Sequence, residues 1–378
     1  MRIFTEADCW ILPIGMQNRG DVAGHGRANV RLENTRDLHM KPEVSIIVPA
    51  FNASELLPKA LKSLADQTLQ ELEVIIVDDG STDDTVRLAE DFAARDDRFK
   101  VVRMEENGGG FKARSNGIKH AIAPWIGFLD ADDFAHRTMF ERLHARCKKD
   151  QSDIAICGTR MVDRSGRMLG VKVGFRRDRV VTDELFEKFC KRDFGSAFLW
   201  NKLYRTDLLH RFGTANPIST PVIGQDTIVN FGCFLEARRV SLISDVLHDY
   251  LIHPKSITQS GNDRLSFCRL FRAFAISVDL YQNRGEEKLH WIAHLYRMQL
   301  AFYPVDDISS LQDHADELGE AVELLAREYP IGLAMLASTG SNQGGPYRFR
   351  KAAEDWVKLT GQTTDLFFKA LMRTFHRQ

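Results

Sequence analysis

The sequence predicts an α/β fold, in which a mostly parallel, doubly wound sheet is flanked by helices and followed by a C-terminal helical extension. Between residues 44 and 150, short β-branched segments alternate with helical patterns, and such alternation gives right-handed crossovers and parallel strands. Polar residues follow the predicted strand ends, at the edge where sheets of this kind bind ligands. From residue 263 onward the pattern is helical, which accounts for the extension.

Length and composition exclude several classes of protein. The chain has 378 residues, of which 44% are hydrophobic and 27% are charged, enough for a sizeable core. Its formal net charge is −1, so it lacks a basic field and we expect no nucleic-acid partner. No apolar segment reaches transmembrane length, and the N-terminus lacks the hydrophobic region of a signal peptide. We therefore expect a cytoplasmic protein.

The cysteines support the same compartment. They form no CxxC pair and have no histidine spacing typical of zinc. We expect reduced, mostly buried thiols. The six are scattered along the chain, at Cys9, Cys147, Cys157, Cys190, Cys233 and Cys268.

Changes in pattern divide the chain into four parts. Residues 1–42 are an N-terminal arm, rich in glycine and charge in its middle, which we expect to dock at a partner subunit of a homo-oligomer. Residues 43–150 and 151–261 are the two halves of the α/β domain, and residues 262–378 are the helical region.

Strands and helices alternate in the first half. Residues 44–48 are apolar and β-branched, and Pro49 stops this strand. Leu57, Leu61 and Leu64 recur at near-helical spacing and predict the helix that follows. Three further strands are expected at residues 74–77, 100–104 and 125–129, with the intervening helices ending near residues 94 and 121.

The second half begins with a strand at residues 154–157 and continues as a β meander over residues 161–181. A helix is expected from residue 182 to about residue 194. In the C-terminal region, the apolar spacing predicts a buried helix face made of Phe267, Leu270, Phe271, Phe274 and Val278.

The last predicted helix is amphipathic and basic. It sets Phe367 and Leu371 against Lys369 and Arg373. Such a helix binds an anionic membrane surface in some proteins and packs on its own protein or a second subunit in others. Both alternatives stay open, and the first predicts a protein peripheral to the inner face of the cell membrane.

Residues 125–133 end a short apolar run in three carboxylates, Asp130, Asp132 and Asp133. In an extended backbone Asp130 and Asp132 leave on the same face, and their oxygens suit Mg²⁺ or Mn²⁺. The alternative is that Asp132 or Asp133 caps a helix over residues 134–149. Polar residues at the other strand ends favour a metal site, with Asp133 left as the helix cap.

Two common phosphate-binding motifs are absent at these strand ends. Residues 49–52 follow the first strand without the GxGxxG pattern of dinucleotide folds. The glycines at residues 108–110 have no lysine at the spacing of a P-loop. A metal ion on carboxylates is the remaining common way to hold phosphates.

Four short motifs follow the predicted strands in order, VSIIVPAFN (44–52), VDDGSTDDT (77–85), NGGGFKARSNG (107–117) and FLDADD (128–133). In order and in spacing they closely resemble the pattern of glycosyltransferase family 2. The resemblance extends over residues 43–260 and implies the GT-A fold, an inverting transfer, a nucleotide-sugar donor that is usually UDP-linked, and a Mn²⁺ or Mg²⁺ ion.

The resemblance also assigns the donor side, to residues 43–150. Residues 49–51 line the nucleoside pocket, and Asp79 accepts a hydrogen bond from the base with Asp78 beside it. The DxD motif falls on Asp130, which also faces ribose or sugar hydroxyls, and on Asp132, the stronger metal ligand. Asp78 has a second interpretation, as a carboxylate facing the next helix. The implied donor-binding residues are Pro49, Ala50, Phe51, Asn52, Asp78, Asp79, Asn107, Lys112, Arg114 and Asp130.

Residues 151–261 correspond to the acceptor side. Residues 200–205 read WNKLYR, which resembles an acceptor-side element of the family and makes Trp200 and Lys202 candidate acceptor contacts. Plain packing of Trp200 is the alternative. Asp226 stands where the family carries its catalytic base, while many relatives have Glu at the position of Gln225. An N-cap of the following helix is the other role open to Asp226.

The segment around residue 253 resembles the family element that closes over the diphosphate. Relatives often carry an arginine where this chain has Leu251. His253 is a candidate metal ligand there, although a lone histidine is often structural.

These residues predict an inverting, metal-dependent glycosyltransferase that transfers a sugar to a saccharide or lipid-linked acceptor in cell-surface polysaccharide or glycolipid synthesis. Asp226 is the predicted base, because the acceptor hydroxyl must lose a proton as it attacks. The departures at Gln225 and Leu251 favour the alternative of a catalytically idle binding or assembly module. A nucleotidyltransferase is a further alternative, since it also places acidic groups on a parallel sheet.

Overall fold

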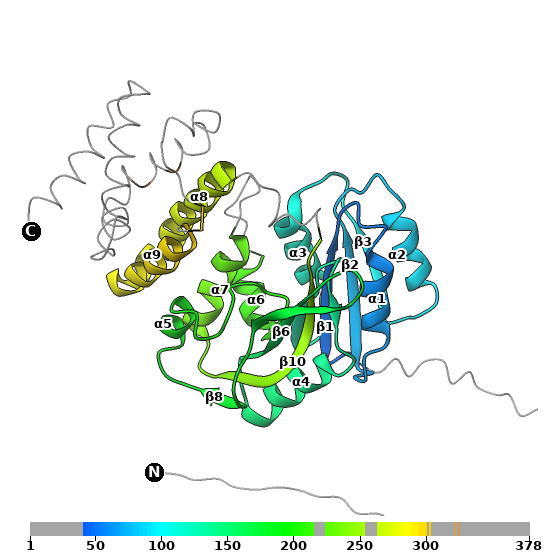
Figure 1. The fold of residues 1–378 in the computed structure, drawn as a ribbon, viewed down its shortest axis with the longest axis horizontal. Coiled ribbons are helices and arrows are strands. Elements are labelled where there is room, and N and C mark those ends of the chain that lie inside the picture. Colours follow the sequence, from blue (N-terminus) through cyan, green and yellow to red (C-terminus); the bar gives the residue numbers. More distant parts are fainter. Residues whose placement is uncertain are drawn as a thin grey trace, which may run out of the picture. The chain divides into compact units, whose positions relative to one another are not determined.

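The computed structural model describes residues 41–214, 224–253 and 263–300, with residues 302, 303, 321 and 325 (Figure 1). Nearly all of the predicted N-terminal arm and the whole basic last helix lie outside these residues. The expected membrane contact and Cys9 lie outside them as well. None of the described helices is both long enough and apolar enough to cross a bilayer.

The first half is built as the sequence predicts. Four parallel strands lie in the order β3-β2-β1-β4, and a helix connects each to the next. Val44 pairs with Leu72 on one side and Trp125 on the other, so the carboxyl ends of β1, β2 and β4 share one edge. The elements are β1 (Val44–Ala50), α1 (Leu57–Ala65), β2 (Leu72–Asp78), α2 (Thr85–Ala93), β3 (Phe99–Arg103), α3 (Gly109–His120) and β4 (Trp125–Phe128).

The second half continues the same sheet, in the order β4-β9-β6-β10-β5, with β7 beside β6 and β8 beside β10. Strand β9 is antiparallel to both β4 and β6, so β6 and the parallel β10 run the same way as β4. The elements are β5 (Phe134–Ala135), α4 (Met139–Asp150), β6 (Ile154–Val162), β7 (Met168–Val173), β8 (Arg179–Val181), α5 (Leu185–Cys190), β9 (Lys202–Arg205), α6 (Thr206–Phe212), α7 (Gln225–Glu236) and β10 (Val240–Leu251).

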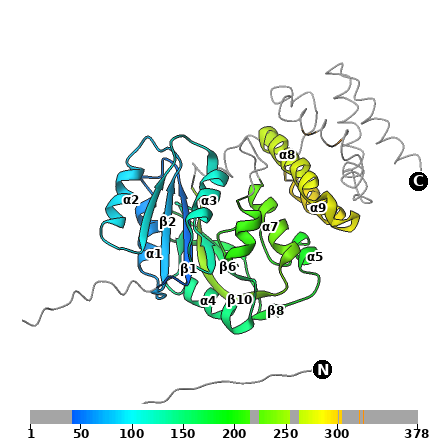
Figure 2. The same ribbon diagram turned by 180° about the vertical axis from the view of Figure 1, so that it is seen from behind.

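Helices cover both faces of the sheet (Figure 2). Because successive side chains of a strand point to opposite faces, Ile46 of β1 belongs to a core under α1 and α4. Its neighbour Ile47 belongs to a second core under α3, α5, α6 and α7. The predicted α/β class with a doubly wound sheet is thus confirmed.

The described part of the C-terminal region is helical, as predicted. Helix α8 (Asp263–Tyr281) packs on α9 (Glu286–Leu300), and they contact α7 and α5 respectively. On α8, Leu270, Phe271, Phe274 and Val278 are buried in the second core, and Phe267 packs against it half-buried.

Two local predictions can be compared with this fold. The five cysteines within the described residues are buried and unbridged. The prediction that Asp133 caps a helix is wrong, because α4 begins only at Met139, after Thr138. The short strand β5 lies between Asp133 and α4, and the Asp133 carboxylate accepts from the Leu251 amide at the end of β10.

Candidate functional site

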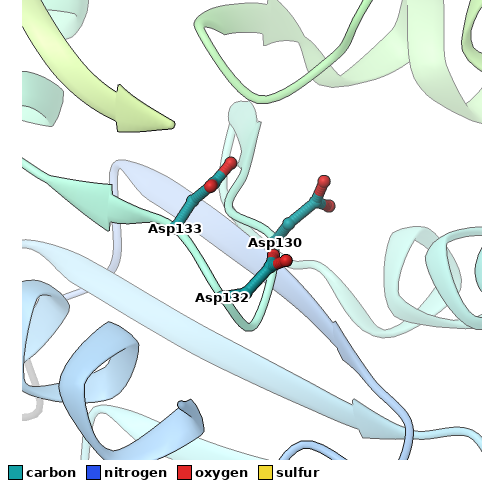
Figure 3. A group of neighbouring side chains, drawn as sticks. All are labelled: Asp130, Asp132 and Asp133. Carbon is teal, nitrogen blue, oxygen red and sulfur yellow. The ribbon is translucent and has the colours of Figure 1, made fainter. Parts of the chain in front are cut away.

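Three carboxylates gather in the turn between β4 and β5. One oxygen from each of Asp130, Asp132 and Asp133 lies within 4.8 Å of the others (Figure 3). This turn follows the end of β4, beside the ends of β1 and β2. The side chains predicted from the FLDADD motif are therefore brought together at the ligand-binding edge of the sheet.

Each carboxylate of this acidic turn has a different partner. Arg114 Nη2 donates to Asp130 Oδ1 at 2.5 Å. His253 Nε2 lies 2.8 Å from Asp132 Oδ2. The Leu251 amide donates to Asp133 Oδ1 at 2.9 Å, which ties the turn to the end of β10.

Burial disfavours the charged form of the carboxylates in this turn. It raises the pKa of Asp132, and the Asp130 carboxylate raises it further, while His253 acts in the opposite direction. Burial also raises the pKa of Asp133 to about 6, against the effect of the nearby His248. A cation at the turn would relieve this repulsion.

The donor set fits a hard divalent cation. Carboxylate oxygens and a neutral imidazole nitrogen both bind Mn²⁺ and Mg²⁺. Asp132 is 36% exposed and, among the described residues, its side chain pairs with His253 alone. Asp130 forms an ion pair with Arg114, and Asp133 is buried and accepts from the Leu251 amide at the end of β10. Asp132 is therefore the best available ligand, with Asp130 and His253 beside it.

Arg114 connects the acidic turn to α7. Its guanidinium donates to Asp130 and also lies 3.8 Å from Asp226 Oδ1. Burial opposes the charge on this arginine, but the carboxylates of Asp130 and Asp226 raise its pKa above the ordinary value. Arg114 thus holds a permanent positive charge between the two halves of the site.

Asp226 lies in the first turn of α7, with 19% of its side chain exposed. The N-cap position belongs to Gly224, which has a φ of +93°, so the prediction of Asp226 as N-cap is wrong. Burial raises the pKa of Asp226, Arg114 opposes this effect and Asp130 adds to it. A carboxylate with a raised pKa is a stronger proton acceptor.

The loops after β1 and β2 are joined by short polar side chains. Asn52 has a φ of +47°, and its Oδ1 accepts from the Thr82 amide at 2.9 Å. The backbone amide of Asn52 donates to Ser81 Oγ at 3.0 Å. Asp83 accepts from Ser54 and Thr85. These bonds fix the two loops that carry the predicted nucleoside-binding residues.

Asp79 holds the start of α3. The Gly108 amide donates to its Oδ1 at 2.7 Å and the Gly109 amide to its Oδ2 at 2.8 Å. Burial raises the pKa of Asp79, against the effect of these two amides, and Asp78 raises it further. Both oxygens of the predicted base-binding carboxylate thus already have a partner, which the sequence did not indicate.

The other predicted donor residues lie around these loops. Phe51 is 47% exposed and Ala50 is buried. Pro49 is half-buried and lies within β1, which continues to Ala50 and does not stop at the proline as expected. Asp78 is buried at the end of β2, where the Ser81 amide donates to one oxygen and the other, Oδ1, has no hydrogen-bond partner. Nearby are the exposed Asn107 and the half-buried Lys112.

The structure puts Trp200 and Lys202 inside the protein, with no more than 1% of either exposed. Trp200 stacks on His248 at 4.3 Å between ring centroids. Lys202 Nζ donates to the carbonyls of Ser196 and Phe198. Burial lowers the pKa of Lys202 to about 7, while Asp226 acts in the opposite direction. Neither side chain is exposed to solvent, which favours the alternative of plain packing for Trp200.

The departures from the family pattern lie close to the site. The side chain of Leu251 is buried, so its amide, and not its side chain, reaches the acidic turn. Gln225 is the first residue of α7 and half-buried. The sequence did not predict that Arg114 would contact Asp226, since 111 residues lie between them in the chain.

Known proteins are similar to this chain in sequence and in fold. The model of the family described as Glycosyl transferase family 2 matches residues 45–209. The chain is 36% identical over 251 residues to EpsJ of Bacillus subtilis, described as an uncharacterized glycosyltransferase. The aligned region covers 65% of this chain and 72% of EpsJ. The chain belongs to glycosyltransferase family 2. This family 2 glycosyltransferase is also 32% identical to EpsH of the same organism, described as putative, over 59% of this chain and 65% of EpsH.

Solved structures agree on the fold of this family 2 glycosyltransferase. TarS 1–349 of S. aureus in complex with UDP superposes with a TM-score of 0.59 over 89% of this chain and 92% of TarS, at 21% identity. TarS has also been solved in complex with UDP-GlcNAc. The likeness shows the fold, which is of the GT-A type predicted from the four motifs.

Proposed function

We propose that this family 2 glycosyltransferase transfers a sugar from a UDP-linked donor, with inversion, to a saccharide or lipid-linked acceptor of a cell-surface polysaccharide or glycolipid. The observation that carries the proposal is the convergence of Asp130, Asp132 and Asp226 around the Arg114 guanidinium. The UDP-bound and UDP-GlcNAc-bound TarS complexes support the choice of donor.

The donor lies over the loops after β1 and β2 in this proposal. Phe51 offers its exposed ring to the base, and residues 49–52 form one wall of the nucleoside pocket together with Asp78 and Asp79. Lys112 and Asn107 approach the donor from the start of α3. The polar bonds between these loops keep the pocket formed before binding, which lowers the entropic cost of association.

Asp132 would be the main ligand of a Mn²⁺ or Mg²⁺ ion at the acidic turn, with Asp130 and His253 beside it. Such an ion would supply positive charge that offsets the charge of the diphosphate and of the departing UDP. Arg114 contributes a fixed positive charge at the same place and keeps Asp130 oriented.

Transfer is a single displacement. The acceptor hydroxyl oxygen attacks C1 of the sugar, the bond from C1 to the β-phosphate oxygen breaks, and UDP leaves with the electron pair. Asp226 takes the hydroxyl proton, a role that its raised pKa supports. One carboxylate is sufficient for this task, so Gln225 need not carry a charge.

A panel of donors tests the proposal. The protein is incubated with UDP-glucose, UDP-galactose, UDP-N-acetylglucosamine and UDP-N-acetylgalactosamine, each with Mn²⁺ and each with EDTA. We expect one donor to release UDP slowly by transfer to water, and EDTA to stop the release. Release of sugar 1-phosphate in place of UDP, which is the leaving group when the uridylyl group is transferred, or no binding of any nucleotide sugar, would contradict the proposal.

A further inference from the structure

The WNKLYR segment and α7 share a buried polar network. Tyr204 Oη donates to Asn230 Oδ1 at 2.7 Å. Asn230 Nδ2 donates to the carbonyl of Ala197 at 2.7 Å and to the carbonyl of Asp226 at 2.9 Å. Tyr204, Asn230 and Lys202 are all fully buried, so this network joins β9, α7 and the segment at residues 196–201 out of reach of solvent.

Lys202 binds the same segment through its ammonium group. Its Nζ donates to the carbonyl of Ser196 at 2.9 Å, to the carbonyl of Phe198 at 2.5 Å and to Asn201 Oδ1 at 2.9 Å. These three acceptors match the three donors of an ammonium group. Asn201 is in turn anchored to β6, since its Nδ2 donates to the carbonyl of Cys157 at 2.9 Å.

Both ends of the network hold Asp226. Asn230 binds the backbone carbonyl of Asp226 from one helical turn away. On the other side, the Leu199 amide interacts with the Asp226 carboxylate and favours its charged form. Leu199 belongs to the segment that Lys202 and Asn230 fix at its carbonyls, so loosening that segment moves a hydrogen-bond donor of the proposed base.

Burying this many polar groups needs an explanation. Apolar side chains of similar volume fill a core at lower cost in free energy, and satisfied buried networks specify one arrangement of the groups they connect. We infer that Tyr204, Asn230 and Lys202 are positioning residues, which hold the segment at residues 196–199 against α7 and so aim the Asp226 carboxylate at the acceptor hydroxyl. The inference rests on the proposed function, because it assumes that Asp226 is the base.

The test compares two substitutions that each remove one buried hydroxyl. Tyr204→Phe removes the donor to Asn230. Tyr296→Phe is the matched control, because Tyr296 is equally buried and, among the described residues, its hydroxyl forms a hydrogen bond with Ser277 alone, at 2.9 Å. For each variant the measurements are UDP release from the donor selected by the panel, UDP binding with Mn²⁺ by calorimetry, and the midpoint of thermal unfolding.

We expect Tyr204→Phe to lower kcat by about 10- to 100-fold, because a small displacement of a catalytic group has an effect of this size. UDP affinity should stay within about twofold of wild type, and Tyr296→Phe should keep the wild-type kcat. The inference is overturned if the two variants lose equal activity, or if Tyr204→Phe loses none.

The pH profile gives a readout that plain destabilisation does not move. The charged groups around Asp226 are Arg114, Asp130 and Lys202, and Tyr204→Phe changes none of them. Loss of the Leu199 interaction raises the pKa of Asp226 further, so the acid limb of the kcat profile should move to higher pH. An unmoved limb counts against the inference.

Asp226→Asn separates the two proposals. If this variant keeps wild-type turnover, the base assignment fails and the positioning inference fails with it. If Asp226→Asn loses turnover while Tyr204→Phe behaves like Tyr296→Phe, only the positioning inference fails.

Discussion

The two sides of the site are built in opposite ways. On the donor side, exposed loops are joined by short side chains such as Asn52 and Asp83, whose hydrogen bonds run from one loop to the next. On the side of the base, fully buried Lys202 and Asn230 hold the backbone around Asp226 from within.

This difference has a physical consequence. Exposed hydrogen bonds exchange with water and contribute little to stability, whereas a buried polar group without its partner costs the full desolvation penalty. On the proposed donor side the loss of one such bond therefore costs little, whereas the proposed base depends on buried groups whose loss costs more. A base must be aimed at one oxygen atom, so support from satisfied buried groups suits the role that we propose for Asp226.

Asp226→Asn should have the largest effect. Asparagine keeps the size of the side chain but cannot accept the acceptor's proton, so kcat should fall by about 10²- to 10⁴-fold. UDP release from the selected donor measures this change. Asp207→Asn is the control, because Asp207 also lies in the first turn of a helix but pairs with Arg205 away from the site.

The pH dependence of the wild-type enzyme follows from the same residue. Only the ionised carboxylate of Asp226 accepts a proton, and burial raises its pKa above the usual value near 3.8, against the effect of Arg114. Activity should therefore fall as the pH drops through that raised pKa. If kcat is flat from neutral pH down to pH 4, Asp226 is not the base.

Lys202→Met should destabilise the fold more than any change on the donor side. Methionine fills most of the volume but leaves the acceptors of Ser196, Phe198 and Asn201 unsatisfied, which should lower the free energy of unfolding by about 3 kcal/mol. Urea unfolding measures this difference. The control Lys62→Met breaks only an exposed pair with Asp66 and should cost less than about 0.5 kcal/mol; equal losses would contradict the proposed contrast.

Asp83→Asn should have a smaller, pH-dependent effect on the donor side. Burial acts to raise the pKa of Asp83, but the hydrogen bonds from Thr85 and Ser54 together outweigh it and lower the pKa to about 2. A lowered folded-state pKa stabilises the protein above the unfolded value near 3.8, and this stabilisation is lost as the pH falls from about 4 towards 2.

The midpoints of thermal unfolding of wild type and Asp83→Asn should thus differ at neutral pH and converge near pH 2. Asp84→Asn is the neighbouring control, since Asp84 makes only an exposed pair with Arg87. A difference that stays constant across this range would show that ionisation of Asp83 contributes nothing.

The sheet and the acidic turn could be predicted because their signals are local. Strand β1 and the loop after it are continuous in sequence, and the carboxylates at residues 130–133 lie within one turn. No comparable local signal indicates that Arg114 lies beside Asp226, or that the Asp79 carboxylate accepts from the Gly108 and Gly109 amides. These contacts depend on how loops from distant strands meet at one edge of the sheet.

The WNKLYR segment was harder to interpret for the same reason. The sequence leaves acceptor contact and plain packing both open for Trp200 and Lys202, and both side chains are buried. A polar residue in a motif near a site looks the same in sequence whether it touches the ligand or supports the residue that does. One retrospective signal exists, since Asn230 stands four residues after Asp226 and so lies one helical turn from it.

A calorimetric titration of UDP in the presence of Mn²⁺ tests most directly whether one side of the site binds the donor and the other carries the base. It is performed on wild type, Asp132→Asn and Asp226→Asn. We predict that Asp132→Asn loses UDP binding, because its main metal ligand is gone, while Asp226→Asn binds within about twofold of wild type. Wild-type binding by Asp132→Asn, or loss of binding by Asp226→Asn, would contradict the account.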